Sequence, residues 1–228
     1  MLGLQRNDRR AFDPDTTPVA VAICRVGGGS THAGLLFPDS EDRPAVLHLA
    51  FHYILIGELL AKAEGWKQAV WAAPDLEEEN AEAIGALARL VWESHGDVGF
   101  AYALRYVQAV FDPANGKLLR AEDEKGFTCA TFVYSIFNSR GYQLLLLDEW
   151  ERRPGDIKFH AWVIGLLVKK EASEEHLLHV AQEMVDGVVR IRPSDVVAAA
   201  AGWPGPMAFQ TATTIGEQAE ALLDEKEE

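Results

Sequence analysis

The period of the apolar residues changes near residue 75, and this change constrains the fold more than any other feature of the chain. Before it lie three short apolar runs, at residues 19–26, 32–37 and 45–52, separated by GGGS and by PDSEDRP. The first run is rich in β-branched residues and is interpreted as a buried strand. The other two predict an antiparallel hairpin with a long loop. We therefore expect a sheet in the N-terminal part of the chain.

After this point the apolar residues follow helical spacing. One helix is expected over residues 76–94, opened by a capping box of Asp75 and Glu78. A second is expected over residues 129–140, with Gly141 as the stop.

The last third of the chain contains three more apolar segments. Residues 157–168 are interpreted as a late strand, and residues 173–185 and 194–201 as closing helices with Ser173 and Ser194 as N-caps. Strands followed by helices, without a repeating βαβ pattern, indicate an α+β fold.

The length of 228 residues is enough for one sizeable core, and neither an internal repeat nor a Gly/Ser- or Pro-rich linker divides the chain. We expect a flexible N-terminal segment over residues 1–17, a single domain over residues 18–216 and an acidic tail over residues 217–228.

The charge balance limits the partners. The chain has 21 basic and 35 acidic residues, a net charge of -14, which argues against nucleic acid and anionic membrane surfaces. The most apolar long stretch, residues 45–60, contains charged and imidazole side chains and is shorter than the ~20 residues that span a bilayer. The N-terminus lacks the apolar run of a signal peptide. We expect a cytoplasmic protein without a stable membrane anchor; delivery by a route other than the Sec pathway stays open.

Cys129 is the first candidate for chemistry. It opens the predicted helix in GFTCATFVYSIF, directly after Thr128, a suitable N-cap. A thiol there faces the partial positive charge of the helix N-terminus, which favours the thiolate, and first-turn amides can hold an oxyanion. The alternative is a buried cysteine that only packs. Cys24, the other cysteine, lies in a predicted strand and is interpreted as core.

A reactive cysteine needs a base, and the predicted hairpin brings two histidines together. His32 opens one strand after the glycine-rich loop and His48 lies on the paired strand, so one imidazole can orient the other. A thiol, a base and a group that fixes the tautomer of the base form a Cys-His-polar triad. Thr128, Tyr102 and Tyr106 are candidate substrate-binding residues, although core packing is an alternative for the tyrosines.

Metal or nucleotide binding is less well supported. His32, His48, His52 and Cys129 carry suitable donor atoms for zinc, but the chain has no CxxC, HExxH or helical HxxxH motif. GGGS lacks the lysine and the helix start of a phosphate-binding loop. We expect neither a metal nor a cofactor.

The segments STHAGLLFPDSEDRPAVLHLA (residues 30–50) and GFTCATFVYSIFNSRGYQLL (residues 126–145) together resemble the circularly permuted branch of the NlpC/P60 cysteine hydrolases, which includes lecithin:retinol acyltransferase-like proteins. The resemblance implies a papain-like catalytic domain, a small antiparallel sheet packed against a Cys-bearing helix with additional helices. It implies Cys129 as nucleophile, His32 as general base and His48 as the orienting group. The implied reaction is hydrolysis or acyl transfer at an amide, ester or thioester bond, with a peptide, a muropeptide or an acyl lipid as substrate.

Two alternatives stay open. His160 follows Cys129 in the chain order of unpermuted papain-like enzymes and is a rival base, although it follows closely in sequence. Family members often have Asn, Asp or Ser before the cysteine, where Thr128 stands here. That difference suggests, as the second alternative, a papain-like module without catalysis that binds a ligand or a partner protein in its cleft.

Overall fold

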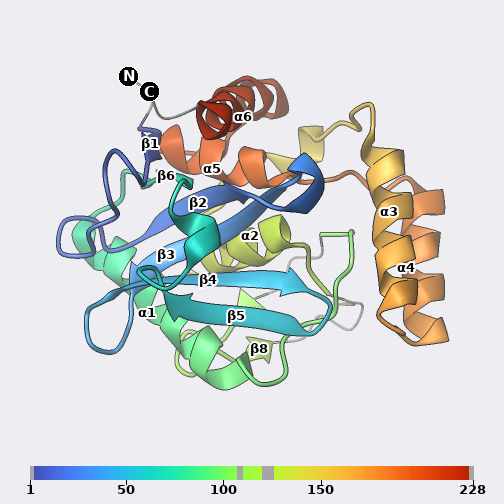
Figure 1. Ribbon diagram of the computed structural model, residues 1–228, viewed down its shortest axis with the longest axis horizontal. Coiled ribbons are helices and arrows are strands. Elements are labelled where there is room, and N and C mark those ends of the chain that lie inside the picture. Colours follow the sequence, from blue (N-terminus) through green and yellow to red (C-terminus); the bar gives the residue numbers. More distant parts are fainter. Residues whose placement is uncertain (1–2, 107–109, 120–125, 226–228) are drawn as a thin grey trace.

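The computed structural model describes residues 3–106, 110–119 and 126–225. Strands dominate the first part of the chain and helices the second, so the expected α+β class is confirmed (Figure 1). The main sheet is antiparallel, with the spatial order β1-β6-β2-β3-β4-β5. Its strands are β1 (Gln5–Arg6), β2 (Ala20–Arg25), β3 (Thr31–Pro38), β4 (Pro44–Phe51), β5 (Ile54–Leu59) and β6 (Val70–Ala72).

The six α-helices come after the strands of the main sheet in sequence, and short 3₁₀ turns occur in both parts of the chain. They are α1 (Glu78–His95), α2 (Cys129–Ser139), α3 (Asp156–Lys169), α4 (Glu174–Asp186), α5 (Pro193–Ala201) and α6 (Phe209–Asp224). A separate two-stranded ribbon pairs β7 (Val110–Phe111) with β8 (Leu118–Leu119).

The predicted hairpin is the pair β3 and β4, in which Phe37 lies opposite Ala45. The carboxylate of Asp39 organises its loop: one oxygen accepts the backbone N–H groups of Glu41 and Arg43, both at 2.9 Å, and the other forms an ion pair with Arg43 at 2.7 Å. An aspartate that bonds backbone groups two residues ahead is typical of a tight turn. The loop is therefore ordered by its own side chains.

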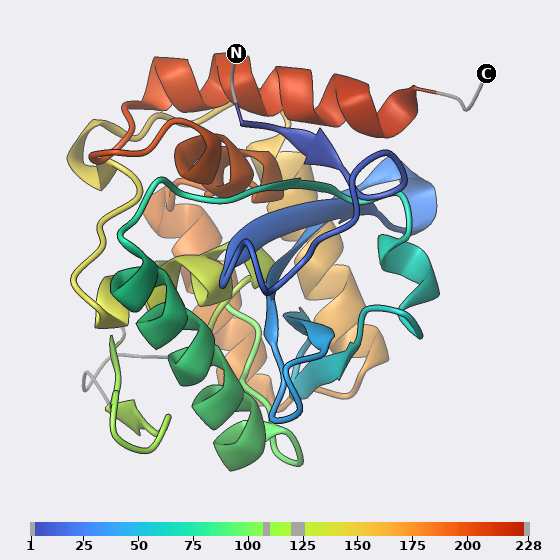
Figure 2. The same ribbon diagram turned by 90° about the vertical axis from the view of Figure 1, so that its left-hand side faces the viewer.

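The two faces of the sheet are covered differently. The face that carries the odd-numbered residues of β3 and β4 packs against α1, α2 and α5 and forms the main core. The N-terminal segment and the connection between β5 and β6 cover the opposite face (Figure 2). Because side chains alternate along a strand, the register decides which chemistry faces which layer. Buried residues on the second face include Phe12, Cys24, Leu36, Val46, Trp66 and Trp71.

The strand expected over residues 157–168 is wrong, because this segment belongs to α3. One side of α3 is buried at Asp156, His160, Val163 and Leu167, which is helical spacing. Its other side leaves large apolar side chains exposed, so the segment is apolar all round and its period does not distinguish a strand from a helix. None of the described helices is long and apolar enough to cross a membrane.

Of the three N-caps predicted for α1, α4 and α5, the structure contains the one at α4. Ser173 caps α4 as expected, because its hydroxyl oxygen accepts the N–H of His176 at 3.2 Å. The Asp75 capping box is wrong: α1 begins at Glu78 without a side-chain cap. At α5, Asp195 rather than Ser194 closes the first turn, since its carboxylate accepts the N–H of Arg192 at 2.7 Å.

Both ends of the chain contain regular structure within the described residues. The segment predicted to be flexible, residues 1–17, contains β1, which pairs with β6, and Phe12, which is buried. The predicted acidic tail, residues 217–228, continues α6 as far as Asp224, which forms an ion pair with Arg25 at 2.7 Å. An apolar stripe of the tail packs on the core beneath its acidic side chains. Residues 1–2 and 226–228 lie outside the described parts of the chain.

Replacing Gly34 with valine should destabilise the protein. A Cβ atom at Gly34 would lie 2.5 Å from the ring of Trp66 and 3.0 Å from Val46, both of which are buried. We expect the free energy of unfolding, measured by urea denaturation, to fall by about 1–3 kcal/mol. Gly65→Ala is the control, since nothing lies within 4 Å of a Cβ atom there. Equal stability of the two variants would contradict the packing of Trp66 on β3.

Candidate active site

Cys129 is the first residue of α2, as predicted, and it is almost fully buried. The helix start is fixed by a reciprocal pair: Thr128 Oγ1 accepts the N–H of Thr131 at 3.1 Å, and Thr131 Oγ1 accepts the N–H of Thr128 at 2.8 Å. Threonine thus takes the place of the Glu or Gln that usually completes a capping box. The Thr128 hydroxyl, a candidate for substrate binding, is used to hold the helix.

The sulfur of Cys129 lies where the ladder between β3 and β4 ends. The last paired residues are Leu35 and Leu47. In an antiparallel ladder, every second residue of a strand directs its N–H and C=O groups at the same partner strand. The N–H of Asp39 donates to the carbonyl of Arg43 at the loop end of the hairpin. The odd-numbered residues of β3, including Ala33, therefore direct their N–H groups towards β4.

No strand partner meets the Ala33 N–H among the described residues. The N–H instead lies near the sulfur of Cys129, where it acts to lower the pKa of the thiol. The thiol therefore occupies the gap that the two diverging strands leave, one peptide group away from His32.

The thiol of Cys129 is neutral in this arrangement. Burial is the largest influence and raises its pKa above the ordinary value. The N–H of Ala33, the Arg190 guanidinium and first-turn N–H groups of α2 act in the opposite direction but do not offset burial. Proton removal in the site thus needs a base.

His32 and His48 are brought together by the hairpin. His32 Nε2 lies 2.9 Å from His48 Nδ1, and the two rings are nearly perpendicular, with an interplanar angle of 85°. The ring of Trp66 covers the pair, with its centroid 5.2 Å from that of His48. Burial lowers the pKa of His32 to about 4 and that of His48 to about 3. Both imidazoles are therefore neutral near pH 7, and one donates the shared proton to the other.

The imidazole pair and the thiol are not joined in this structure. Even-numbered residues of β3 and β4 face the layer of Trp66, whereas Cys129 belongs to the core on the other face. Among the described residues, no hydrogen bond links the Cys129 sulfur to His32 or His48. The sequence thus predicted a His–His contact that forms, and a Cys–His contact that this arrangement lacks.

Cys24 lies opposite His32 on β2 and is buried, as expected for a core residue. Burial raises the pKa of its thiol to about 12, and the thiol of Cys129 adds to this effect. The two cysteines are both free thiols.

Tyr102 contacts the candidate nucleophile directly. The backbone N–H of Cys129 acts on its hydroxyl to lower the pKa, but burial raises that pKa by more, so the phenol keeps its proton. The backbone of Tyr102 is held by two histidines: its N–H donates to His52 Nδ1 at 3.1 Å, and its carbonyl lies 2.9 Å from His176 Nε2. Tyr106, the other tyrosine candidate, packs against Tyr134 with 4.8 Å between ring centroids.

Arg190 is the residue that sequence reasoning missed. Its guanidinium is within electrostatic range of both the Tyr102 phenol and the Cys129 thiol. It lies between α4 and α5, in VVRIRPSD, and no motif in that segment marks it. The adjacent Arg192 is indistinguishable from it in sequence, so only the fold identifies which arginine faces the site.

His160, the rival base, lies in the middle of α3 rather than on a strand. It is 1% exposed, and neither ring nitrogen has a hydrogen-bond partner. The charged groups that act on it are Asp156, Arg152 and Arg190, and burial lowers its pKa. The structure does not join it to Cys129 by a hydrogen bond.

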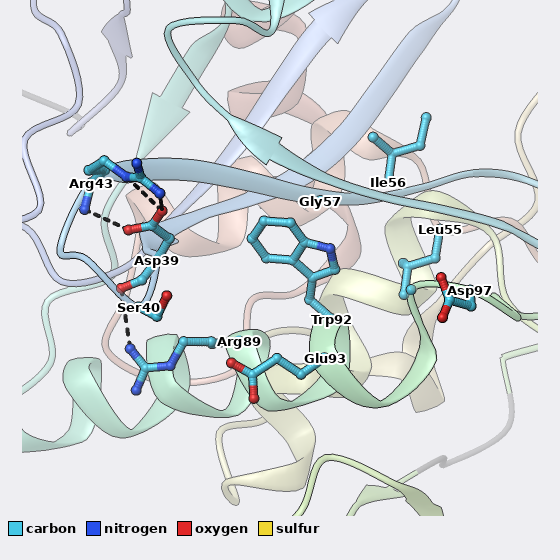
Figure 3. A pocket seen from close by; sticks show the side chains of 11 residues that line it. Asp39, Ser40, Arg43, Leu55, Ile56, Gly57, Arg89, Trp92, Glu93 and Asp97 are labelled. Atoms are coloured by element: carbon cyan, nitrogen blue, oxygen red, sulfur yellow. Dashed lines mark hydrogen bonds and ion pairs between the residues drawn. The ribbon is translucent and has the colours of Figure 1, made fainter.

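A groove of about 530 Å³ lies on different elements, the β3–β4 loop, β5 and α1 (Figure 3). Asp39 and Arg43 line one end, and Trp92 and Arg89 project from α1. The groove carries charges of both signs but no cysteine or histidine, so it offers neither a thiol nor an imidazole base.

No family model, no curated protein and no solved structure matches this chain. Within the described residues, no three His, Cys, Asp or Glu side chains gather in a way that could hold a metal ion. The groups that can take part in chemistry at this site are Cys129, Tyr102, Arg190 and the histidine pair.

Thr128→Ala should destabilise α2, because it removes the acceptor for the N–H of Thr131. A lost N-cap costs about 1–2 kcal/mol, measured as the free energy of unfolding in urea. Thr128→Ser keeps the hydroxyl and should retain most of the stability. If alanine and serine have the same effect, the cap does not contribute as described.

The histidine pair should make stability depend on pH. Because their pKa values are lowered on folding, the unfolded chain binds more protons between pH 6.5 and about 4, and stability is lost as pH falls through that window. His48→Gln removes one titrating group, so the loss of unfolding free energy between pH 7 and pH 4.5 should shrink by roughly 1–3 kcal/mol. Parallel pH profiles for the two proteins would contradict a buried neutral pair.

Proposed function

We propose that this protein is a papain-like cysteine hydrolase or acyltransferase of the permuted NlpC/P60 type, with Cys129 as nucleophile. The observation that carries the proposal is the position of the thiol. It lies at the N-terminus of α2 and in the gap between the two strands that hold the hydrogen-bonded His32–His48 pair. A small antiparallel sheet packed against the cysteine-bearing helix is the arrangement that the resemblance implies.

The contact between the histidines assigns their roles. When His32 Nε2–H donates to His48 Nδ1, His32 Nδ1 has a free lone pair, as a general base requires. His48 then fixes the tautomer of His32 and becomes the orienting residue. In the arrangement seen here, the His32 imidazole contacts His48 and is not hydrogen-bonded to the thiol of Cys129. Because the imidazole and the thiol lie on opposite faces of the sheet, catalysis requires the backbone at the open end of β3 to change conformation when substrate binds.

The reaction then proceeds by acyl transfer. His32 takes the thiol proton, and the thiolate of Cys129 forms a bond to the carbonyl carbon of an amide, ester or thioester. The bond to the leaving group breaks, and the leaving group takes the proton from the imidazolium. Water or a second acceptor attacks the acyl-enzyme and restores the thiol.

Tyr102 is the proposed donor to the oxyanion. Its hydroxyl lies near the backbone N–H of Cys129 and keeps its own proton, which it can donate to a developing negative charge next to the sulfur. A phenol with a raised pKa remains a donor throughout the neutral range. Peptides, muropeptides and acyl lipids are the candidate substrates, in the cytoplasm if the expected localisation holds.

A second candidate function is a papain-like module that binds a ligand or a partner protein without catalysis. The observation in its favour is the neutral, buried thiol of Cys129, together with imidazoles that face the other layer. Such a module would keep its fold and lack acyl transfer.

The test is acylation by an activated ester. We expect p-nitrophenyl acetate to form a mass-detectable acyl adduct on Cys129 near pH 7, and Cys129→Ala to abolish it. His32→Ala should slow adduct formation by about 10²–10⁴-fold, the usual contribution of a general base. Cys24→Ala is the matched control, since it removes the other buried thiol and should leave the rate unchanged.

Circular dichroism of each variant establishes that it is folded. A folded wild-type protein without any adduct on Cys129 would favour the binding module. Acylation of the His32→Ala variant at the wild-type rate would exclude His32 as the base.

A further inference from the structure

The two edges of the main sheet differ in how they end. The edge strand β1 is only two residues long, and its Arg6 side chain donates to the carbonyl oxygens of Leu222 and Glu225, at 3.3 Å and 2.6 Å, at the end of α6. The other edge strand, β5, is six residues long, and within the described chain it pairs only with β4. An edge strand presents a row of backbone donors and acceptors to a further strand. The edge of β5 can therefore pair with another segment.

The register of β5 determines which of its backbone groups face outwards. The carbonyl of Pro44 accepts the N–H of Leu60 at 2.9 Å, so the even-numbered residues of β4 are those that direct their backbone groups at β5. The register pairs them with even-numbered residues of β5. Leu55 and Gly57 consequently direct their N–H and C=O groups away from β4. Among the described residues, none forms a hydrogen bond with these outward groups.

The outward groups lie along the groove of about 530 Å³ between β5 and α1. Figure 3 shows the strand on one side and the helix on the other, with the indole of Trp92 between them. Leu55 and Gly57 both line the strand side. The β3–β4 loop lines one end of the groove with Asp39, and Asp97, directly after α1, lines the other. The groove thus follows the open edge of the sheet.

The floor of this groove depends on the absence of a side chain at Gly57. A Cβ atom at Gly57 would lie 2.2 Å from the ring of Trp92, so any other residue would displace the indole from the strand. Residues that lie directly opposite each other on two strands point their side chains to the same face. A residue opposite Gly57 would therefore direct its side chain towards Trp92, where an apolar group can pack on the indole.

The charges of the groove distinguish its two ends. Arg89 lies near the β3–β4 loop, and its guanidinium donates to the carbonyl oxygen of Asp39 at 3.3 Å. Glu93 lies between the two ends on α1. Asp97 is exposed at the end that Leu55 lines, next to the C-terminus of α1, which carries a partial negative charge (Figure 3). This end of the groove favours a basic side chain.

We propose that the groove binds an extended peptide, which adds to β5 as an antiparallel strand with an apolar residue opposite Gly57 and a basic residue opposite Leu55. Each of these pairs can exchange two backbone hydrogen bonds. Strand addition of this kind obtains affinity from the backbone and selectivity from alternate side chains. In the antiparallel alignment, the basic residue follows the apolar one by two positions. The inference does not depend on Cys129 and goes beyond the proposed function.

The probe is a fluorescein-labelled hexapeptide, TTVTKT, whose valine is to lie opposite Gly57 and whose lysine is to lie opposite Leu55. We expect saturable binding to the full-length protein, measured by fluorescence anisotropy. Methylation of the backbone nitrogens of the valine and the lysine should weaken binding at least about tenfold, because two hydrogen bonds to β5 are lost. The matched control peptide is methylated at the threonines directly before them, whose N–H groups point away from β5, and should bind like the parent peptide.

Asp97→Lys tests the charge preference. It should weaken binding of the lysine peptide roughly two- to fivefold, the effect of an exposed ion pair, and favour a peptide with glutamate in place of the lysine. Glu82→Lys is the matched control: it makes the same charge change at an exposed position of α1 outside the groove and should leave the preference unchanged.

Amide hydrogen exchange, measured by NMR, locates the bound peptide. The N–H groups of Leu55 and Gly57 should exchange rapidly in the free protein and slowly with the probe bound. Absence of saturable binding, equal weakening by the two methylation patterns, or equal effects of Asp97→Lys and Glu82→Lys would overturn the proposal. Protection of the two amides that rises with protein concentration, without peptide, would assign the edge to a second copy of the chain and overturn it as well.

Discussion

The structure around the site depends on one backbone group, the N–H of Ala33. The phase of the β3–β4 ladder aims it at β4, but the two strands have already diverged, and the sulfur of Cys129 lies near it instead. The first residue of α2 therefore lies against the open end of the hairpin. The hydroxyl of Tyr102 lies near the N–H of the same cysteine.

The same divergence separates the chemical groups into two layers. His32 and His48 extend from the strands into the layer of Trp66, where burial keeps both imidazoles neutral. Cys129 and Tyr102 lie in the layer of the helices. Arg190 stacks on Phe159, which packs against the same core. A site of this kind is assembled from one hairpin, one helix start and one connecting loop, none of which is sufficient alone.

The sequence predicted those parts of the fold that local pattern controls. The β3–β4 hairpin and the start of α2 follow from alternation, turn residues and a threonine cap, and all of them were expected. α3 was not, because a segment that is apolar on every side carries no period. The acidic amphipathic tail predicted at residues 217–228 is the end of α6, and its narrow apolar stripe packs on the core as far as Leu223.

The sequence by itself determined which residues can react and which strands carry them: two cysteines, one of them at a helix start, and two histidines on paired strands. The contact between His32 and His48 followed, because strand pairing and alternation are local rules. Only the tertiary structure decided that α2 packs on the face opposite those imidazoles, and that the charge of Arg190 rather than that of Arg192 acts on the thiol. These choices depend on how distant segments pack together, and no spacing along the chain records them.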